Sequence, residues 1–324
     1  MQPTPRTVLV ITAAEDVTAN LVIEALNARQ VQVCRFDPAD LGTKLTFHAT
    51  IGDDRKGWAG RLLTPSRDIA LEEVGAVYYR RPTSYLSRFA HLPAVEQQFA
   101  AVEAQHGLGG ILHSLSGAVY VNHPAAIRRA DYKPAQLQTA TQLGLAIPCT
   151  LVTNDVEQAR AFTEHGPIIY KSFRGVPPGP DGSRSAIWTQ QVTPEELDES
   201  VSVTAHLFQQ EIPKTADARV TVIGQQVFAY RITSPDGALD WRSGEWEQLT
   251  HEPIATPEPI RRALHAYLDQ FGLMFGCFDF ALNATGGRPE TWTFVECNPN
   301  GQWAWLPDAD AMAHAFADLI LEGW

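Results

Sequence analysis

The sequence predicts an α/β protein that begins with a small doubly wound domain and continues into two α+β subdomains. Its 324 residues are long for a single core, so we expect two or three subdomains. Residues 7–120 alternate strand and helix patterns, whereas residues 206–324 carry mostly patterns of antiparallel strands. The expected units are residues 1–120, 121–205 and 206–324.

The N-terminal pattern is that of a β-α-β unit. Residues 7–12 form a continuous apolar run, typical of a parallel strand that is buried on both faces. Apolar residues recur at helical spacing through 19–29, and 31–36 is the next strand. The turn after the first strand lacks the G-x-G-x-x-G pattern, and no G-x-x-x-x-G-K-[ST] motif occurs in the sequence. A dinucleotide fingerprint and a P-loop are therefore both unsupported.

Three further elements complete the first domain. Residues 47–51 and 58–63 predict an inserted hairpin, and 74–79 another strand. Residues 96–113 predict a closing helix, which the glycines at 107–110 could interrupt.

The other two units differ in their patterns. The central unit has strand patterns at 148–152 and 167–173 around a helix at 155–164, followed by a Gly/Pro-rich loop over 174–185 and a strand at 186–189. The third unit has five strand patterns and two helices. The strands are expected at 207–212, 219–223, 226–232, 275–282 and 292–298, and the helices at 260–271 and 308–321.

Composition excludes several classes of partner. A formal net charge of −12 argues against a broad electrostatic footprint for nucleic acid. No segment approaches about 18 uninterrupted apolar residues, so no membrane span is expected. The four cysteines have no metal-type spacing and lie in apolar runs, as small buried hydrophobes do in a reducing cytosol. We therefore expect a cytoplasmic protein that binds neither nucleic acid nor membrane.

Two adjacent apolar strands carry oxygen-bearing side chains. Alternation places Glu296 and Asn298 on one face of the second strand, together with Phe294, while Asp279 lies on the first strand. An unpaired carboxylate is costly on an apolar strand. Asp, Glu and Asn oxygens suit Mg²⁺ that is held jointly with substrate phosphates. The alternative is that these are the polar ends of ordinary strands.

Lys171 and the loop after it favour an anion site. The lysine lies inside an expected strand, where its ammonium group must reach solvent or meet an anion. Gly175, Gly179 and Gly182 permit close backbone approach to phosphate. A loop of this length is more often a mobile lid than a plain connector. The alternatives are a lysine at a strand edge and an ordinary surface loop.

Other side chains could complete a nucleotide site. Lys133 lies where a helix meets Pro134, close in sequence to Arg128 and Arg129, although a solvated basic helix face is the commoner explanation. Glu211 and Ile212 precede a proline, where freed backbone groups could bind an adenine. Arg219 and Arg231 lie on paired strands and could bind phosphate or a developing oxyanion; the alternative is cross-strand ion pairs.

The order of these motifs resembles the ATP-grasp ligases. The nearest branch is that of the graspetide, or microviridin-type, maturases, which install side-chain ester or amide cross-links in ribosomally made peptides. The matching pieces cover nearly the whole chain. They are Val77-Tyr-Tyr-Arg-Arg-Pro82, Asn122-His-Pro124, Tyr132-Lys-Pro134, Tyr170-Lys171, Asp217-x-Arg-Val-Thr-Val222, Asp240-Trp-Arg242, Phe278-Asp-Phe280 and Glu296-Cys-Asn-Pro-Asn-Gly-Gln-Trp303.

The resemblance implies an ATP-grasp fold with a pre-ATP-grasp domain, and ATP and Mg²⁺ clasped between the central and C-terminal units. The implied nucleotide contacts are Lys133, Lys171, Ser172, Gly175, Gly182, Glu211, Ile212 and Lys214. The implied metal ligands are Asp279, Glu296 and Asn298, and Arg219 and Arg231 would steady the transferred phosphoryl group. Ser172 stands where the family usually has proline.

The implied activity is an ATP-dependent cross-linking of a precursor peptide. An Asp or Glu side chain would become an acyl phosphate, and a hydroxyl or amine of the same peptide would then displace phosphate. The acidic enzyme would repel an acidic core peptide at long range, so we expect a separate leader segment to bind near 194–200. A homodimer is expected from the family likeness. The alternatives are a ligase acting on free amino acids or adding glutamate to a protein terminus, and a nucleotide-binding regulator without turnover.

Overall fold

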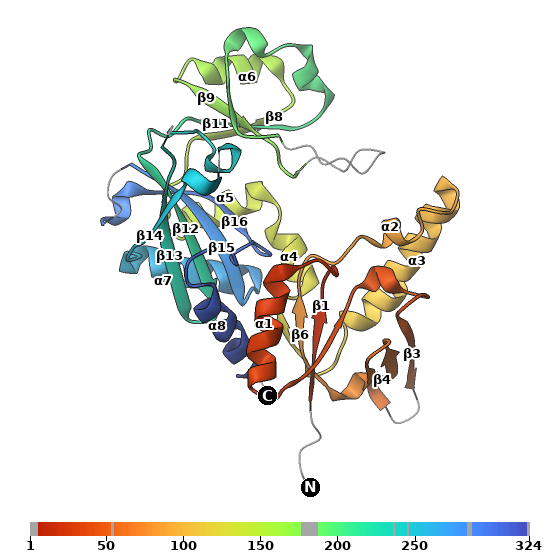
Figure 1. Ribbon diagram of the computed structural model, residues 1–324. Helices are drawn as coiled ribbons and strands as arrows, with labels where there is room; N and C mark the ends of the chain where they lie inside the picture. The colour runs from red at the N-terminus through yellow and green to blue at the C-terminus, as the bar shows by residue number, and fades with distance from the viewer. Residues whose placement is uncertain are drawn as a thin grey trace.

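The computed structural model describes residues 6–52, 55–175, 187–235, 237–244, 246–283 and 287–322. Figure 1 shows an N-terminal sheet on one side, a larger C-terminal sheet on the other, and a small unit beyond the C-terminal sheet. The mixed α/β architecture agrees with the predicted fold class. The boundaries between the units stay a prediction.

The N-terminal sheet is parallel throughout, with strand order β2-β1-β6-β7. Its strands are β1 (Thr7–Ile11), β2 (Gln32–Phe36), β6 (Val74–Tyr79) and β7 (Val119–Val121). Alternate side chains of the central strand β1 pack on opposite faces of the sheet. Val8 and Val10 pack in the cluster that contains helix α1 (Val17–Ala28), whereas Leu9 and Ile11 pack against helix α3 (Ala94–Leu112). The predicted doubly wound arrangement is confirmed.

Three smaller elements cover this domain. The predicted hairpin is present as β3 (Thr46–Gly52) and β4 (Arg55–Leu63), joined by β5 (Asp68–Ala70) in a small antiparallel sheet. The short helix α2 (Tyr85–Arg88) precedes α3. The expected break in α3 at its glycines is wrong. The helix is continuous because Leu108, within that stretch, and Ile111, directly after it, bury their side chains in the core.

The central unit is a four-stranded sheet with order β10-β9-β11-β8, antiparallel at each pairing. Its elements are β8 (Thr150–Thr153), α6 (Val156–Thr163), β9 (Ile168–Lys171), β10 (Gln190–Val192) and β11 (His206–Gln210). The strand expected at 186–189 is wrong, since strand pairing begins at Gln190. Most of the preceding loop, 176–186, lies outside the described residues.

The C-terminal sheet has five antiparallel strands in the order β14-β13-β12-β15-β16. They are β12 (Ala216–Ile223), β13 (Gln226–Thr233), β14 (Thr250–Pro253), β15 (Phe275–Leu282) and β16 (Trp292–Asn298). One face of this sheet forms a core with helices α4 (Pro124–Ala130), α5 (Lys133–Gln142) and α7 (Glu258–Phe271). The opposite face carries the polar side chains described below.

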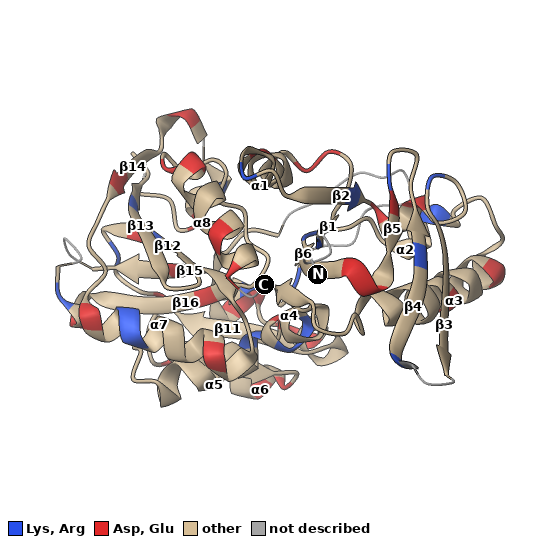
Figure 2. Ribbon diagram, turned by 90° about the horizontal axis from the view of Figure 1, so that it is seen from below, with Lys and Arg blue, Asp and Glu red and all other residues tan. Residues whose placement is uncertain are grey.

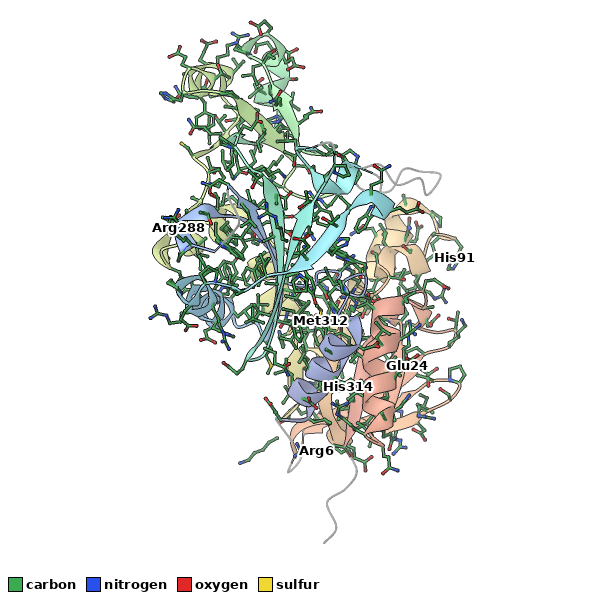
Figure 3. All side chains as sticks on the ribbon, turned by 60° about the vertical axis from the view of Figure 1, so that its left-hand side comes forward. Arg6, Glu24, His91, Arg288, Met312 and His314 are labelled. Atoms are coloured by element: carbon green, nitrogen blue, oxygen red, sulfur yellow. The ribbon has the colours of Figure 1, made fainter. Side chains whose placement is uncertain are left out.

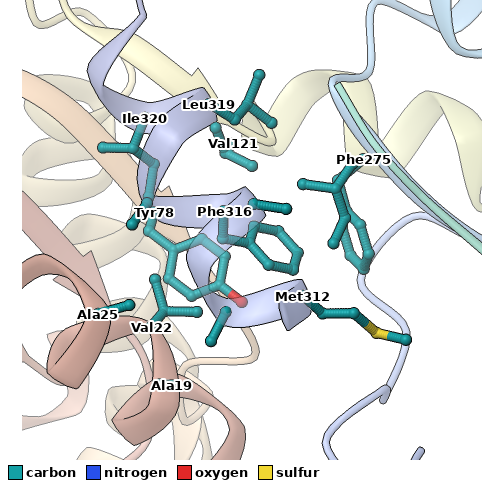
Figure 4. Packing of buried hydrophobic residues seen from close by; sticks show 14 of the residues in the cluster. Ala19, Val22, Ala25, Tyr78, Val121, Phe275, Met312, Phe316, Leu319 and Ile320 are labelled. Atoms are coloured by element: carbon teal, nitrogen blue, oxygen red, sulfur yellow. The ribbon is translucent and has the colours of Figure 1, made fainter. Parts of the chain in front are cut away.

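The last helix, α8 (Ala309–Leu321), joins the two ends of the chain. It packs beside α1, and in Figure 3 its labelled residues Met312 and His314 lie next to the helix that carries Glu24. Figure 4 shows Phe316 between Tyr78 of β6 and Phe275 of β15. The N-terminal and C-terminal sheets therefore share one apolar core.

Charge and cysteine placement complete the description. Acidic and basic segments are scattered over all parts of the ribbon in Figure 2. Cys34, Cys277 and Cys297 are buried as expected, whereas Cys149 is exposed. Within the described ranges, none of the helices combines the length and the hydropathy that crossing a bilayer requires.

Candidate active site

The candidate site lies on strands β15 and β16, where a β-bulge sets the direction of the side chains. Asp279 pairs with Glu296, but the next pair is Phe280 with Phe294, so Val295 is an extra residue. The bulge turns Phe294 into the core beside α7, while Glu296 faces the same side as Asp279. The expectation that Phe294 and Glu296 share a face is therefore wrong. Simple alternation cannot reveal an inserted residue.

Asp279 and Asn298 contact each other across the strands. The Asn298 side-chain nitrogen donates to Asp279 Oδ2 at 3.1 Å and to Glu296 Oε1 at 3.4 Å. Arg219 approaches Asp279 from the neighbouring strand β12, and its Nη1 lies 2.8 Å from both carboxylate oxygens. The three residues predicted as metal ligands are thus brought together, with Arg219 beside them.

Glu296 is the most strongly compensated carboxylate of the cluster. It is buried, and it forms an ion pair with Lys133 at the start of α5 and a longer one, 3.6 Å, with Arg242. Burial alone would raise the pKa of Glu296, but Lys133, Lys171 and Arg242 outweigh burial and hold that pKa well below its usual range. Glu296 therefore stays ionised at any physiological pH.

The cluster forms one end of a pocket between the central and C-terminal sheets. Its apolar walls come from both units, as expected for a planar ring. They are Ile169, Ile212, Leu239, Trp241, Ala281 and Val295. Charged side chains also line the same pocket. They include Lys171, Lys214, Asp217, Asp240, Arg242, Asp279 and Glu296.

Lys171 and Lys214 enter this pocket in different electrostatic states. Burial lowers the pKa of Lys171 to about 8, partly offset by Glu296. Lys214 instead donates to both oxygens of Asp217, at 2.9 and 2.6 Å, and to the Leu239 carbonyl. Burial raises the pKa of Asp217 to about 6, against the effect of Lys214. Lys171 is thus the less compensated of the two lysines.

A second pocket adjoins the first and shares four of its residues, Lys171, Thr189, Arg242 and Glu296. It extends towards the N-terminal domain. Of the predicted residues, Lys133, Ser172, Gly175 and Asn298 line it. Arg81, Asp131 and Arg174 close its outer side. The two pockets together offer one space for a planar group and another for a second reactant.

Three predicted residues are not brought into this cluster. Arg231 pairs with Ala218 and Glu252, whereas Arg219 pairs with Tyr230, so strand alternation directs the two arginines to opposite faces of the sheet. Glu211 lies at the pocket mouth, where it accepts a hydrogen bond of 2.6 Å from Gln191. Gly182 lies outside the described residues.

The turn after β16 is held by residues that the sequence patterns did not single out as site residues. Arg80 is fully buried, forms an ion pair with Asp16 and donates to the Gly301 carbonyl at 3.0 Å. Asn122 donates to the carbonyls of Phe275 and Pro299, both at 2.8 Å. A Cβ at Gly301 would lie 2.5 Å from that of Cys277, so only glycine fits here. The N-terminal domain thus fixes the turn that follows Asn298.

Gln136 orients β16 from the other side. Its side-chain nitrogen donates to the Cys297 carbonyl at 2.8 Å, and its oxygen accepts from the Cys297 amide at 2.9 Å. Both bonds are buried, so they fix the strand between Glu296 and Asn298. A lone glutamine on a helix gives no sequence signal for this role.

The donor set fits Mg²⁺. Asp279 and Glu296 supply carboxylate oxygens, and a half-turn of the Asn298 amide would present its oxygen to the same point. Among the described residues no group of three His, Cys, Asp or Glu side chains could hold a metal by itself. A cation at this point would therefore complete its coordination with water or phosphate oxygens, as Mg²⁺ does.

The chain was compared with protein families and with curated proteins. The family profile "MvdD pre-ATP grasp domain" matches residues 7–128. No curated protein matches the sequence.

Three solved structures align over nearly the whole chain. A RiPP-associated ATP-grasp ligase of Chryseobacterium gregarium, in complex with ADP and a leader and core peptide, is 27% identical with a TM-score of 0.87, over 98% of this chain and 97% of that one. The macrocyclase MdnC of Microcystis aeruginosa MRC, bound with precursor peptide MdnA, is 29% identical with a TM-score of 0.84, covering 98% and 100%. The macrocyclase MdnB of the same organism is 27% identical with a TM-score of 0.78, covering 98% and 99%.

Proposed function

Because this chain belongs to the ATP-grasp ligases of the graspetide branch, we propose that it uses ATP to close side-chain ester or amide rings in a ribosomally made precursor peptide. The observation that carries the proposal is the convergence of Asp279, Glu296 and Asn298, of which Asp279 and Glu296 line a pocket with apolar walls and Asn298 lines the adjoining one. Solved structures that resemble this chain hold ADP and a leader and core peptide, or a precursor peptide.

ATP would bind with its adenine between the apolar walls of the first pocket and its phosphates beside the charged side chains that line it. We assign the adenine to the segment at Glu211 and Ile212, and the phosphates to Lys133, Lys171 and Lys214. Ser172, Gly175 and Gly182 would contribute from the loop after β9. Mg²⁺ held by Asp279, Glu296 and Asn298 would neutralise charge on the phosphates. In this arrangement the lysines face the phosphates and the carboxylates face Mg²⁺, so that each buried charge has a partner of opposite sign.

The first chemical step is phosphoryl transfer to a carboxylate. An oxygen of a peptide Asp or Glu side chain attacks the γ-phosphorus, the bond to the bridging β-γ oxygen breaks, and ADP leaves. Arg219 lies beside Asp279 and would stabilise charge on the transferred group. The resemblance gives Arg231 the same role, and the proposal for this residue rests on the resemblance alone. The strand register directs its side chain to the face of the sheet opposite Arg219.

The second step closes the ring. A hydroxyl or amine of the same peptide attacks the acyl carbon, and inorganic phosphate leaves. Holding both peptide groups in one pocket replaces a bimolecular encounter, which is the main contribution a protein can make here. The enzyme's share is thus positioning and charge stabilisation.

Two further proposals concern assembly and cellular location. We propose a cytoplasmic homodimer; the buried free thiols of Cys34, Cys277 and Cys297 fit a reducing compartment. A leader segment of the peptide is proposed to bind near 194–200, at the edge of the central sheet.

The test of the function is mass spectrometry after co-expression. The enzyme would be produced together with a candidate precursor, a short Thr-rich and Asp/Glu-rich peptide sought among the reading frames beside its gene. The expected product has lost one water for each ring that is closed, and tandem fragmentation stops within each ring. An unmodified peptide, with no ADP formed in a purified assay, would refute the proposal.

Lys171 gives a pH-dependent prediction. Its ammonium attracts phosphate while it is protonated, and burial lowers its pKa to about 8, so ADP affinity should fall as the pH rises through that value. One lost charge can weaken binding by at most about tenfold per pH unit. Calorimetric titration across this range measures the effect. Lys171→Arg keeps its charge and should abolish the fall, whereas an identical fall in both proteins would contradict the assignment.

A further inference from the structure

Arg81 has a strained backbone next to the second pocket. Its φ is +35°, and only one other non-glycine residue of the described ranges, Gln30, has a positive φ. Such strain persists only where the surroundings enforce it, and it clusters at functional sites. Here Arg80 is anchored in the core on one side, and on the other the Thr83 amide donates to Asp37 at 3.1 Å. Because these two contacts fix the chain before and after Arg81, the Arg81 backbone has to adopt this conformation to connect them.

The Arg81 side chain lines the second pocket without a carboxylate partner. Its Nε donates to the Asn300 carbonyl at 2.9 Å, and in the described structure its two terminal nitrogens have no hydrogen bond or ion pair. Of the other cations around this pocket, Lys171 has no ion pair within the described ranges and is buried at the nucleotide side, whereas three are paired. Lys133 contacts Glu296, Arg242 contacts Asp240, and Arg174 contacts Asp131. The Arg81 guanidinium therefore keeps two parallel donors that match a carboxylate.

Its position is at the metal end of the nucleotide pocket. Asn300, which Arg81 contacts, is two residues beyond Asn298, and Asn298 contacts both Asp279 and Glu296. Glu296 and Lys171 line both pockets, so the two spaces are continuous. An anion held by Arg81 would lie next to the phosphates of a nucleotide in the first pocket.

We propose that Arg81 binds the peptide carboxylate that is to be phosphorylated and orients one of its oxygens towards the γ-phosphate. This inference rests on the proposed function and assigns its acceptor site. The carboxylate oxygen forms the new bond to the γ-phosphorus, and the electron pair of the broken bond leaves with ADP. Arg81 itself exchanges no proton in this step, since a guanidinium stays protonated. The N-terminal domain thus supplies a substrate contact to a nucleotide site built by the other two units.

The kinetic test compares Arg81→Asn with the wild type, using the precursor peptide encoded beside the gene. Asparagine tolerates a positive φ, so the strained backbone is retained. Loss of a bidentate charged contact should lower kcat/KM for the peptide about 10- to 100-fold. ADP affinity should change less than about twofold. Arg81→Lys keeps the charge but lacks the two parallel donors of a guanidinium, so its kcat/KM should lie between those of the wild type and Arg81→Asn. Arg61→Asn, at an exposed arginine that lines neither pocket, is the control and should stay near the wild type.

A double-mutant cycle separates substrate contact from a structural role. The binding of the natural peptide and of a peptide with its core Asp and Glu changed to Asn and Gln is measured with ADP and Mg²⁺ present. In the wild type the acidic peptide should bind about tenfold more tightly, and in Arg81→Asn this preference should disappear. An equal preference in both proteins, or a parallel loss of ADP affinity, would overturn the Arg81 assignment. Absence of turnover by the wild type would instead overturn the proposed function.

Discussion

Replacing Glu296 by Gln is expected to abolish ADP formation while the protein remains folded. The change keeps the shape of the side chain but removes the charge that holds the metal and balances Lys133, Lys171 and Arg242. Residues that only orient a metal ligand typically cost about 10- to 100-fold when they are replaced, so a direct ligand should cost more than about 100-fold. Initial rates of ADP release with the precursor peptide measure the loss.

The control for Glu296→Gln is Glu290→Gln. Glu290 precedes the same strand, and its side chain is 64% exposed in an ion pair with Arg288. Its replacement should leave both the rate and the melting temperature unchanged. Far-UV circular dichroism and thermal melting would establish that both variants fold. A Glu296→Gln enzyme that retains its rate within a few-fold would mean that the metal is held elsewhere.

Replacing Arg80 by Met should produce the largest loss of stability. Arg80 is fully buried, and its ion pair with Asp16 has an Nε–Oδ2 distance of 2.8 Å. Removing one partner of a buried pair leaves an uncompensated charge, so the free energy of unfolding should fall by about 3–5 kcal/mol. The turn at Gly301 and Gln302 would also lose its anchor to the N-terminal domain. Urea denaturation measures the change.

Two further variants test the cause of that loss. Arg80→Met combined with Asp16→Asn should be less destabilised than the sum of the single variants, because the stranded charge is then absent. Arg61→Met removes an exposed pair, with side chains 43% and 57% exposed, and should cost less than about 1 kcal/mol. An Arg80→Met protein with wild-type stability would show that neither the buried pair with Asp16 nor the contact with Gly301 contributes to stability.

The sequence patterns were sufficient for most strands and for the three polar side chains that lie together on β15 and β16. Period-two alternation on two apolar strands identified Asp279, Glu296 and Asn298, because charged oxygens on such strands need a partner. The patterns could not detect the extra residue at Val295, which turns Phe294 into the core. They also could not reveal the register that separates Arg219 from Arg231, since pairing between strands is a property of the folded sheet.

Contacts between segments that are distant in the sequence could not be predicted from it either. The core that Phe316 forms with Tyr78 and Phe275 joins the first and third units of the sequence. The pattern of a single helix or strand does not show which other element it packs against. The same holds for Arg80 and Arg81, which a sequence motif names but whose contacts at Gly301 and Asn300 require the fold. Long-range burial, rather than local propensity, decides these positions.

The most direct measurement is a crystal structure with a non-hydrolysable ATP analogue and Mg²⁺. The predicted result is a metal within about 2.0–2.1 Å of oxygens from Asp279, Glu296 and Asn298 and of phosphate oxygens, with the adenine between the central and C-terminal sheets. A nucleotide bound elsewhere, with Glu296 still paired to Lys133 and Asp279 to Arg219 as in the free protein, would contradict it.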